Sequence, residues 1–350
     1  MIVTLIYFIF ILGIIVLVHE FGHFFFAKLF GVHAYEFSVG MGPKIWGTKP
    51  KKKDSTPFNI RAIPIGGYVA LAGEDPEEED KTVPKSKKLF AKPIWQRFLI
   101  MFFGAGNNFI LAFVVLFIIA LISGAPDMTP SINKLDEKYP MYQAGIREND
   151  IVTKINGHNI STIDDIQVYM ILASNSKEST FDIKRGSEHK TFKVTPKKVK
   201  EEDGSTSYKF GIVFEQKMNK GILPSIKYAF VKIGALCKQM VIVLANLFTG
   251  KLSLNNLSGP VGIYSVVGEA RSTGLVNVFY LIALLSVNIG FINLIPLPAF
   301  DGGRIFFLVI EAFKGSPVSP KVENTIHNIG FFILLGLMVV ITLNDIIKLF

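Results

Sequence analysis

Four long apolar runs divide the 350-residue chain. A helix crosses a bilayer with about 20 mostly apolar residues, and residues 2–26, 98–122, 275–297 and 329–343 have this character. A fifth run, residues 228–248, carries Lys232 and Lys238 in an amphipathic pattern, which favours a helix outside the membrane. The pattern therefore predicts a polytopic α-helical membrane protein with four spans.

The basic residues predict the orientation of these spans. Residues 28–97, between the first two spans, contain thirteen lysine and arginine residues, and the connection between the last two contains Arg304, Lys314 and Lys321. Because positive charge is enriched on the cytoplasmic side, both connections are expected in the cytoplasm. Both termini and the long segment between the second and third spans are then expected outside it.

That long segment changes character over residues 127–217, where short alternating strands are separated by polar turns. Residues 139–157 contain Ala144-Gly145-Ile146 and end in an Asn156-Gly157 turn, a sequence that resembles the PDZ family. Asn149 stands where that family usually has glycine. The resemblance implies one extracytoplasmic, mainly β domain, with a helix at 161–172 and strands over 180–194. Its groove either binds a peptide or serves only as a spacer or filter.

Composition agrees with a membrane protein. Half of the residues are apolar and 19% are charged, below the roughly 25% of soluble domains, which excludes a purely soluble enzyme and a disordered chain. The net charge of +9 is accounted for by membrane topology, so no nucleic-acid partner is expected. The single cysteine, Cys237, excludes a disulfide framework, a cysteine-type zinc site and an iron–sulfur cluster.

The first span contains the pattern His19-Glu20-Phe21-Gly22-His23. Positions i and i+4 lie on one face of a helix, so the two imidazoles can bind one metal ion while Glu20 deprotonates a water molecule beside it. A glutamate inside a span costs about 3 kcal/mol unless it has a partner or water, which marks the position as functional. The pattern predicts a site for one zinc ion.

A catalytic zinc ion usually has three protein ligands, so one more is needed. His33, His158, His189 and His327 are candidates by residue type, but Asp301 is preferred. It follows Pro296 and Pro298, which break the helix at a depth where irregular backbone must be buried or line a wet cavity. With four spans, Asp301 lies at the same membrane face as the two histidines. The alternative is an aspartate that merely caps the next helix.

HExxH together with Asn293-x-x-Pro296-x-Pro298-x-x-Asp301-Gly302 resembles the site-2 protease family of intramembrane zinc metalloproteases, and most closely the bacterial regulator-of-sigma-E protease type. The resemblance covers essentially the whole chain. Residues 63–69 resemble the family's membrane-associated β-hairpin, and residues 257–263 resemble the segment entering the third span. Two departures are Ala105, where the family has proline, and space for one PDZ domain rather than two.

The resemblance and the residue chemistry imply the same assignment: His19, His23 and Asp301 bind zinc, and Glu20 is the general base. The side-chain amide of Asn293 is the candidate oxyanion donor, unless it satisfies freed carbonyls at the helix break. A helical substrate must unwind before cleavage and could add to a strand edge, so Gly66, Gly67, Tyr68 and Asn108 are candidate substrate-binding residues. The two glycines could instead form a plain tight turn.

The expected function is hydrolysis of transmembrane segments of single-span proteins, with anti-sigma-factor-like substrates and remnant signal peptides implied by the resemblance, in a bacterial cytoplasmic (inner) membrane. The alternatives are a non-catalytic scaffold that binds peptides through its PDZ domain, and a metal transporter. An intact Glu20 argues against the first, and nearly bare spans argue against the second. The predicted segments are a first span at 1–27, a cytoplasmic loop with the β-hairpin at 28–97, a second span at 98–123, the PDZ domain at 127–217, an amphipathic helix and connector at 222–256, a third span region at 257–303, a cytoplasmic connection at 304–328 and a fourth span at 329–350.

Overall fold

A computed structural model describes residues 1–49, 55–74, 81–173, 178–200, 206–213, 217–250, 252 and 257–348. The chain forms two compact units, one of residues 1–115 with 243–350 and one of residues 116–242. Residues 251 and 253–256, at the end of the segment predicted as amphipathic helix and connector (222–256), lie outside the described residues.

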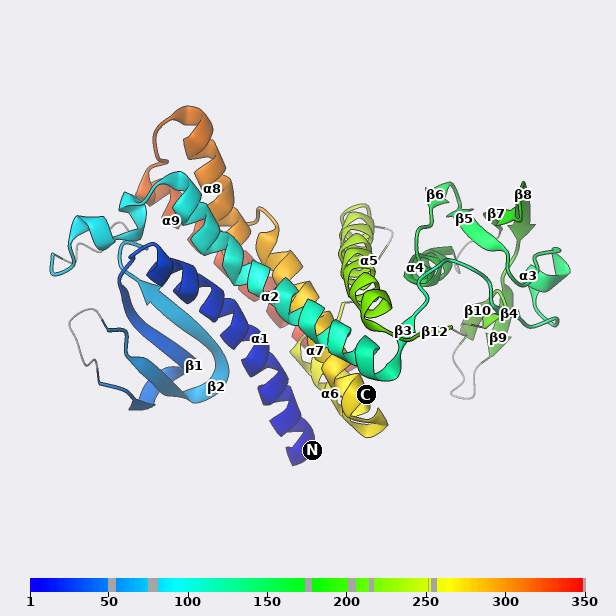
Figure 1. The fold of residues 1–350 in the computed structure, drawn as a ribbon, viewed down its shortest axis with the longest axis horizontal. Coiled ribbons are helices and arrows are strands. Elements are labelled where there is room, and N and C mark those ends of the chain that lie inside the picture. The colour runs from blue at the N-terminus through cyan, green and yellow to red at the C-terminus, as the bar shows by residue number, and fades with distance from the viewer. Residues whose placement is uncertain are drawn as a thin grey trace. The chain divides into compact units, whose positions relative to one another are not determined.

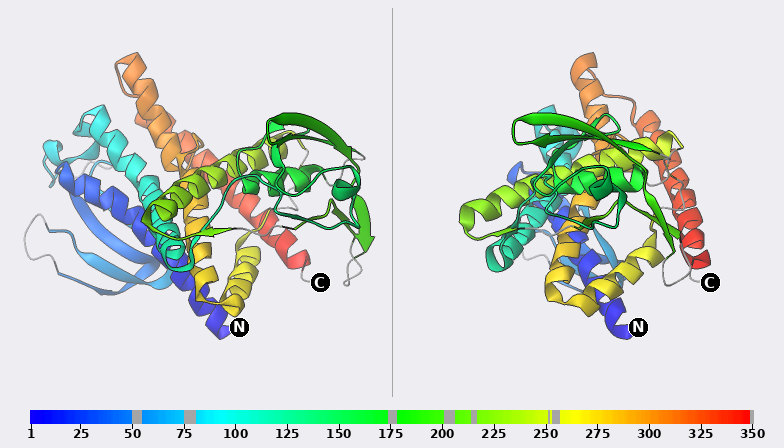
Figure 2. Two further views of the ribbon diagram at one scale, coloured as in Figure 1. Left: turned by 45° about the vertical axis from the view of Figure 1, so that its right-hand side comes forward. Right: turned by 90° about the vertical axis from the view of Figure 1, so that its right-hand side faces the viewer.

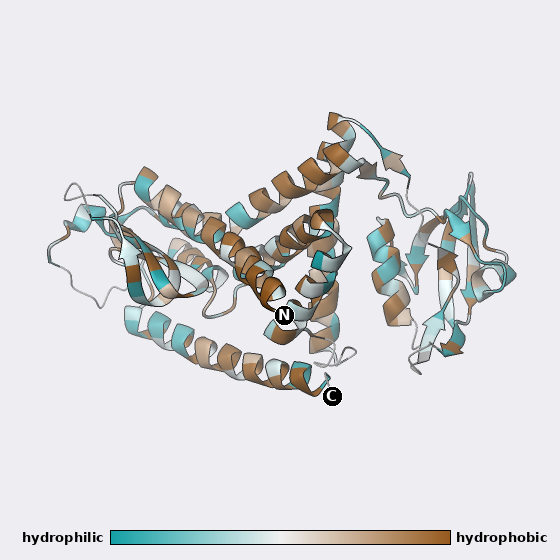
Figure 3. Ribbon diagram, turned by 90° about the horizontal axis from the view of Figure 1, so that it is seen from below, coloured by the Kyte–Doolittle hydropathy of each residue, from teal (hydrophilic) through white to brown (hydrophobic). Residues whose placement is uncertain are grey.

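The first unit is built from long apolar helices and a β-hairpin (Figure 1). Its helices carry hydrophobic residues along most of their length (Figure 3). Helix α2 continues into the second unit. The elements are α1 (Ile2–Leu29), β1 (Ala34–Gly47), β2 (Phe58–Leu71), the short 3-10 turns η1 (Lys85–Lys87) and η2 (Leu89–Ala91), α2 (Ile94–Ser123), α6 (Pro260–Thr273), α7 (Leu275–Leu294), α8 (Asp301–Lys314) and α9 (Pro320–Ile347).

Two apolar clusters hold this unit together. One joins α1, α6 and α7, whose ribbons lie close together (Figure 2). It includes Ile11, Ile15, Val267 and Leu281. The other packs the base of the hairpin, including Phe37, against the end of α1 and the start of α2. Burial of these side chains fixes α1 between the hairpin on one side and α6 and α7 on the other.

The hairpin is larger than the sequence indicated. Residues 63–69 do not form a hairpin by themselves but lie within β2, which pairs antiparallel with β1 in a two-stranded sheet with several bulges. Gly66 adopts a left-handed conformation (φ 83°) inside β2, so it bends the strand and does not form the tight turn considered from sequence.

The second unit contains a four-stranded antiparallel sheet in the order β6-β5-β7-β8. The turn between β5 and β6 is the expected one, because Asn156 (φ 50°) and Gly157 (φ 80°) both adopt positive φ. Asn149 has φ 68°, a left-handed conformation that glycine adopts at no steric cost. This conformation accounts for the glycine that the PDZ family usually has at this position. The elements are β3 (Ala125–Pro126), β4 (Lys134–Leu135), α3 (Pro140–Gln143), β5 (Ile151–Ile155), β6 (His158–Asn159), α4 (Ile163–Ala173), β7 (Ser179–Arg185), β8 (Glu188–Val194), β9 (Lys197–Lys200), β10 (Thr206–Lys209), β11 (Ile212–Val213), β12 (Met218–Asn219) and α5 (Ile222–Phe248).

Among the described residues, five helices are long and apolar enough to cross a membrane: α1, α2, α5, α7 and α9. The chain is therefore a multi-pass membrane protein with β elements. By length and composition α5 also qualifies, although its lysines predict a place outside the membrane. Helix α2 runs unbroken through the buried Ala105, the residue that replaces the family proline.

Candidate metal centre

Three side chains converge where α1 meets the start of α8. His19 and His23 lie one turn apart on α1, and each is only 9% exposed. His19 Nε2 and His23 Nε2 are 3.2 Å apart. The Oδ2 atom of Asp301 lies 3.2 Å from the first of these nitrogens and 3.4 Å from the second.

Close contact between α1 and α2 orients His23. Its Nδ1 donates a hydrogen bond to the carbonyl oxygen of Ile100, at 2.8 Å, which directs Nε2 toward His19 and Asp301. A Cβ atom on Gly104 would lie 2.2 Å from His23 Nε2, and one on Gly22 would lie 1.9 Å from a backbone oxygen of α2. Glycine at these two positions is therefore what allows the helices to approach and the imidazole to fit.

A broken helix delivers Asp301. Helix α7 ends at Leu294 and α8 begins at Asp301, so the break expected from the two prolines is confirmed. Phe300 is the N-cap residue, and α8 has no side-chain capping hydrogen bond. The carboxylate of Asp301 thus faces the histidines and does not cap its own helix.

The three atoms have the arrangement that a metal ion requires. They all lie within 4.8 Å of one another, and two ligands about 2.05 Å from a tetrahedral zinc ion would lie about 3.3 Å apart. Asp301 Oδ2 is buried and has no hydrogen-bond partner in the described part of the chain. Two imidazole nitrogens and a carboxylate oxygen are donors that suit zinc, and the set leaves a fourth position open.

Glu20 lies beside this cluster. The backbone N–H of Val69, in β2, donates to Glu20 Oε2 at 3.1 Å, which fixes the carboxylate next to the metal ligands. Glu20, the three ligands, Tyr68 and Val69 are among the residues that line a cavity of about 220 Å³. The cavity therefore holds a carboxylate, a metal-ligand set and a strand edge together.

The other predicted site residues lie at different distances from the cavity. Tyr68 lines it, and its hydroxyl donates to Glu36. Asn293, Gly66 and Gly67 are not among the described residues that line it. Asn108 is completely buried, with Nδ2 3.5 Å from His19 Nδ1. This burial favours a role in orienting His19; substrate binding by Asn108 stays a prediction.

The remaining histidines do not contribute ligand atoms to this cluster. His158 and His189 lie in the second unit, and His33 follows the end of α1. His327, on α9, accepts a hydrogen bond from the backbone of Ala299. Among the described candidates by residue type, Asp301 alone joins His19 and His23.

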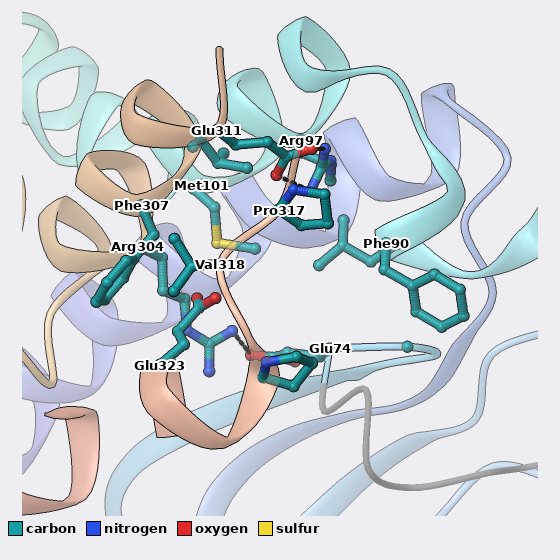
Figure 4. A pocket seen from close by; sticks show the side chains of 14 residues that line it. Glu74, Phe90, Arg97, Met101, Arg304, Phe307, Glu311, Pro317, Val318 and Glu323 are labelled. Atoms are coloured by element: carbon teal, nitrogen blue, oxygen red, sulfur yellow. Dashed lines mark hydrogen bonds and ion pairs between the residues drawn. The ribbon is translucent and has the colours of Figure 1, made fainter. Parts of the chain in front are cut away.

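Sequence reasoning missed two ion pairs next to the site. Arg304, one turn after Asp301, donates to Glu74 Oε1 at 2.5 Å, and Arg97 binds Glu311 through two hydrogen bonds. Both pairs face a second cavity of about 260 Å³ (Figure 4), which shares Glu74, Met101 and Arg304 with the first. The partners are separated by 230 and 214 positions, so no local signal in the sequence could have paired them.

Buried metal ligands with a carboxylate beside them, on helices apolar enough to span a bilayer, are the features of a membrane-embedded metal-dependent hydrolase. The sequence model of Peptidase family M50 matches residues 7–337. The chain is 32% identical to the regulator of sigma-W protease RasP of Bacillus subtilis and 32% identical to the zinc metalloprotease RasP of Bacillus licheniformis, with 99% of each chain covered. It is 35% identical to a putative zinc metalloprotease of Clostridium perfringens, with 95% of each covered.

The chain therefore belongs to peptidase family M50, the site-2 protease family, and is a zinc metalloprotease of a membrane. The resemblance stated from the two motifs is confirmed.

Proposed function

We propose that this enzyme hydrolyses peptide bonds within transmembrane segments of single-span membrane proteins, with zinc held by His19, His23 and Asp301. The observation that carries the proposal is the convergence of these three ligand atoms, 3.2–3.4 Å apart, at the ends of apolar helices. Zinc bound there polarises a carbonyl and lowers the pKa of a water molecule toward 7.

Glu20 is the proposed general base. Its carboxylate lines the ligand cavity and is held by Val69 N–H, so it can accept a proton from water and then donate it to the leaving amine. Asn108 is buried behind His19, where an amide oxygen would fix the tautomer with Nε2 free to bind metal. Asn293 remains the candidate donor to the oxyanion.

Strand β2 is the proposed platform for unwound substrate. The N–H of Val69 points toward Glu20, away from β1, so β2 presents an edge to the cavity. Gly66, Gly67 and Tyr68 lie along the same strand, and Ile45, Trp46 and Ile63 of the hairpin are more than half exposed. Exposed apolar side chains here favour contact between the hairpin and the bilayer.

Four spans, with α5 outside the membrane, are the proposed topology. If α1 runs toward the cytoplasm, α2 runs away from it. Asp301 follows α7, so it can meet His19 and His23 only if α7 also runs toward the cytoplasm. A single crossing by α5 would reverse α7. Lys232 and Lys238 on α5 also form ion pairs, both at 2.7 Å, with Asp164 and Asp165 at the start of α4.

Cysteine labelling in intact cells would test this topology. With Cys237 replaced by alanine, a membrane-impermeant maleimide should label Lys227→Cys, on α5, and leave Lys314→Cys, at the end of α8, unlabelled. Both lysines are exposed. Labelling of Lys314→Cys in intact cells would contradict the four-span arrangement.

Residues 127–217 are proposed to be an extracytoplasmic PDZ domain that screens substrates. A cavity of about 330 Å³ lies between α4, through Met170, and the segment Tyr208–Ile212, a suitable groove for an extended peptide. Its occupant is a peptide ligand, or the domain acts as a filter for bulky ectodomains. Deleting residues 127–217 should widen the range of ectodomain sizes accepted, and an unchanged range would contradict the filter.

The name of the Bacillus subtilis relative, regulator of sigma-W protease, assigns that protein a role in regulating a sigma factor. Anti-sigma-factor-like proteins and remnant signal peptides are accordingly the proposed substrates, in a bacterial cytoplasmic membrane. Purified enzyme should cleave a tagged single-span substrate, and Glu20→Gln should lose that cleavage while it keeps zinc. Turnover by Glu20→Gln equal to that of wild type would refute the base assignment.

A further inference from the structure

The segment that delivers Asp301 has an unusual backbone. Residues 295–300 join α7 to α8, and Ala299, two positions before Asp301, has φ 73°. Residues with a Cβ atom rarely adopt this left-handed conformation, and it persists only where surrounding contacts enforce it. The contacts around Ala299 therefore determine the direction in which the chain enters α8.

One of these contacts is a hydrogen bond from α9. The N–H of Ala299 donates to His327 Nδ1 at 3.0 Å. Because Nδ1 accepts, the imidazole carries its proton on Nε2, which is buried without a hydrogen-bond partner among the described residues. Among the described residues, the hydrogen bond from Ala299 N–H is thus the one that the His327 ring makes.

The ring also packs against the start of α8. Its centroid lies 5.7 Å from that of Phe307, and a Cβ atom on Gly303 would lie 3.2 Å from His327 Cε1. His327 therefore contacts Ala299 in the loop and the first two turns of α8. These contacts lie on both sides of Asp301 along the chain.

Gly330, one turn further along α9, supports the same loop. A Cβ atom at Gly330 would lie 2.2 Å from Pro298 Cβ and 3.1 Å from the Pro298 backbone carbon. Residues 327 and 330 share one face of a helix. That face of α9 is in direct contact with the loop at two consecutive residues, Pro298 and Ala299.

We propose that His327 is a positioning residue for the metal centre: its Nδ1 holds Ala299 in the left-handed conformation and so directs Asp301 toward His19 and His23. It acts through the backbone and not as a ligand. The proposal rests on the proposed function, in which Asp301 binds zinc. Helix α9 thereby sets how tightly the enzyme holds its metal.

The test measures zinc release from the full-length enzyme in detergent, after addition of excess chelator and a zinc-responsive dye. His327→Leu keeps the side-chain bulk but removes the acceptor, and should release zinc about tenfold faster or more, the usual scale for loss of a supporting partner. His327→Asn should release zinc within about threefold of wild type, because its Oδ1 is two bonds from Cβ, as Nδ1 is. His189→Leu, on the exposed surface of β8, is the matched control.

Asp301→Asn, measured in parallel, separates the two proposals. If it releases zinc rapidly while His327→Leu behaves as wild type, positioning by His327 is overturned and the ligand assignment stands. Equal acceleration in His327→Leu and His327→Asn would show that the acceptor atom has no role, which also overturns the proposal. If Asp301→Asn retains zinc as wild type does, the ligand assignment itself fails.

Discussion

Replacing Asn108 by leucine should weaken zinc binding without preventing folding. Asn108 is fully buried between α1 and α7: its backbone oxygen accepts a hydrogen bond from Ser286 at 2.9 Å, and its side-chain amide faces His19 Nδ1 at 3.5 Å. Its Oδ1 has no partner among the described residues. A half-turn of the amide places this oxygen opposite Nδ1, which can then donate to it while Nε2 binds metal.

The magnitude follows from the group left unpaired. Leucine has the same branched four-atom skeleton as asparagine but no acceptor, so a buried imidazole N–H loses its partner at a cost of about 1–3 kcal/mol. Since 1.4 kcal/mol corresponds to a factor of ten, zinc affinity should fall about 5- to 150-fold. Losses of 10–100-fold are typical when a ligand loses its supporting hydrogen bond.

Zinc affinity would be measured by competition with a chelator in detergent, for wild type, Asn108→Leu and Asn107→Leu. Asn107 is the matched control because its amide donates to the carbonyl oxygen of Val18, at 3.3 Å, and not to an imidazole. Equal affinity in wild type and Asn108→Leu would refute the orienting role. Equal losses in both variants would show a general packing effect.

Three further results are expected. Asp345 is 5% exposed and accepts hydrogen bonds from Gly259 N–H and Gly262 N–H at 2.8 Å each. Because hydrogen bonds to a charged group contribute about 1.5–3 kcal/mol each, Asp345→Ala should lower the free energy of unfolding in detergent by about 3 kcal/mol. An unchanged unfolding midpoint would contradict this. Lys232→Met should destabilise the second unit by about 3 kcal/mol, because it leaves the buried carboxylate of Asp164 without its ion-pair partner. The double variant Lys232→Met with Asp164→Leu should recover most of that stability. A larger loss in the double variant would contradict the proposed contribution of the ion pair. Burial raises the pKa of Asp150, but hydrogen bonds from Arg185 and from Arg147 N–H outweigh burial and hold this pKa below the ordinary value. The ionised Asp150 therefore stabilises the folded state above about pH 4, and this contribution is lost as pH falls through the folded-state pKa. Arg185→Ala should accordingly begin to unfold in acid at a higher pH than wild type.

Local spacing accounts for what the sequence predicted well. The i, i+4 separation of His19 and His23 determines that both face one point, whatever the rest of the fold. Pro296 and Pro298 cannot continue a helix, so the break before Asp301 follows from their chemistry. The Asn156-Gly157 turn likewise follows from two residues that tolerate positive φ.

Contacts between distant segments account for what could not be predicted. Strand β1 was missed because its pairing with β2 depends on a bulged register and on packing against α1, not on a regular alternation of apolar residues. The bond between His327 and Ala299 depends on α9 packing against a loop 28 positions earlier. The complete burial of Asn108 depends on the packing of α1, α2 and α7, which no local pattern in the sequence specifies.

The zinc content per chain tests the central claim most directly. We predict about one zinc ion per chain in wild type, in Glu20→Gln and in Glu269→Ala, whose carboxylate lies exposed on α6. Asp301→Ala, purified in the same way, should retain well under half of that amount. A full zinc complement in Asp301→Ala would contradict the account, because the three converging atoms would then not be the set that holds the metal.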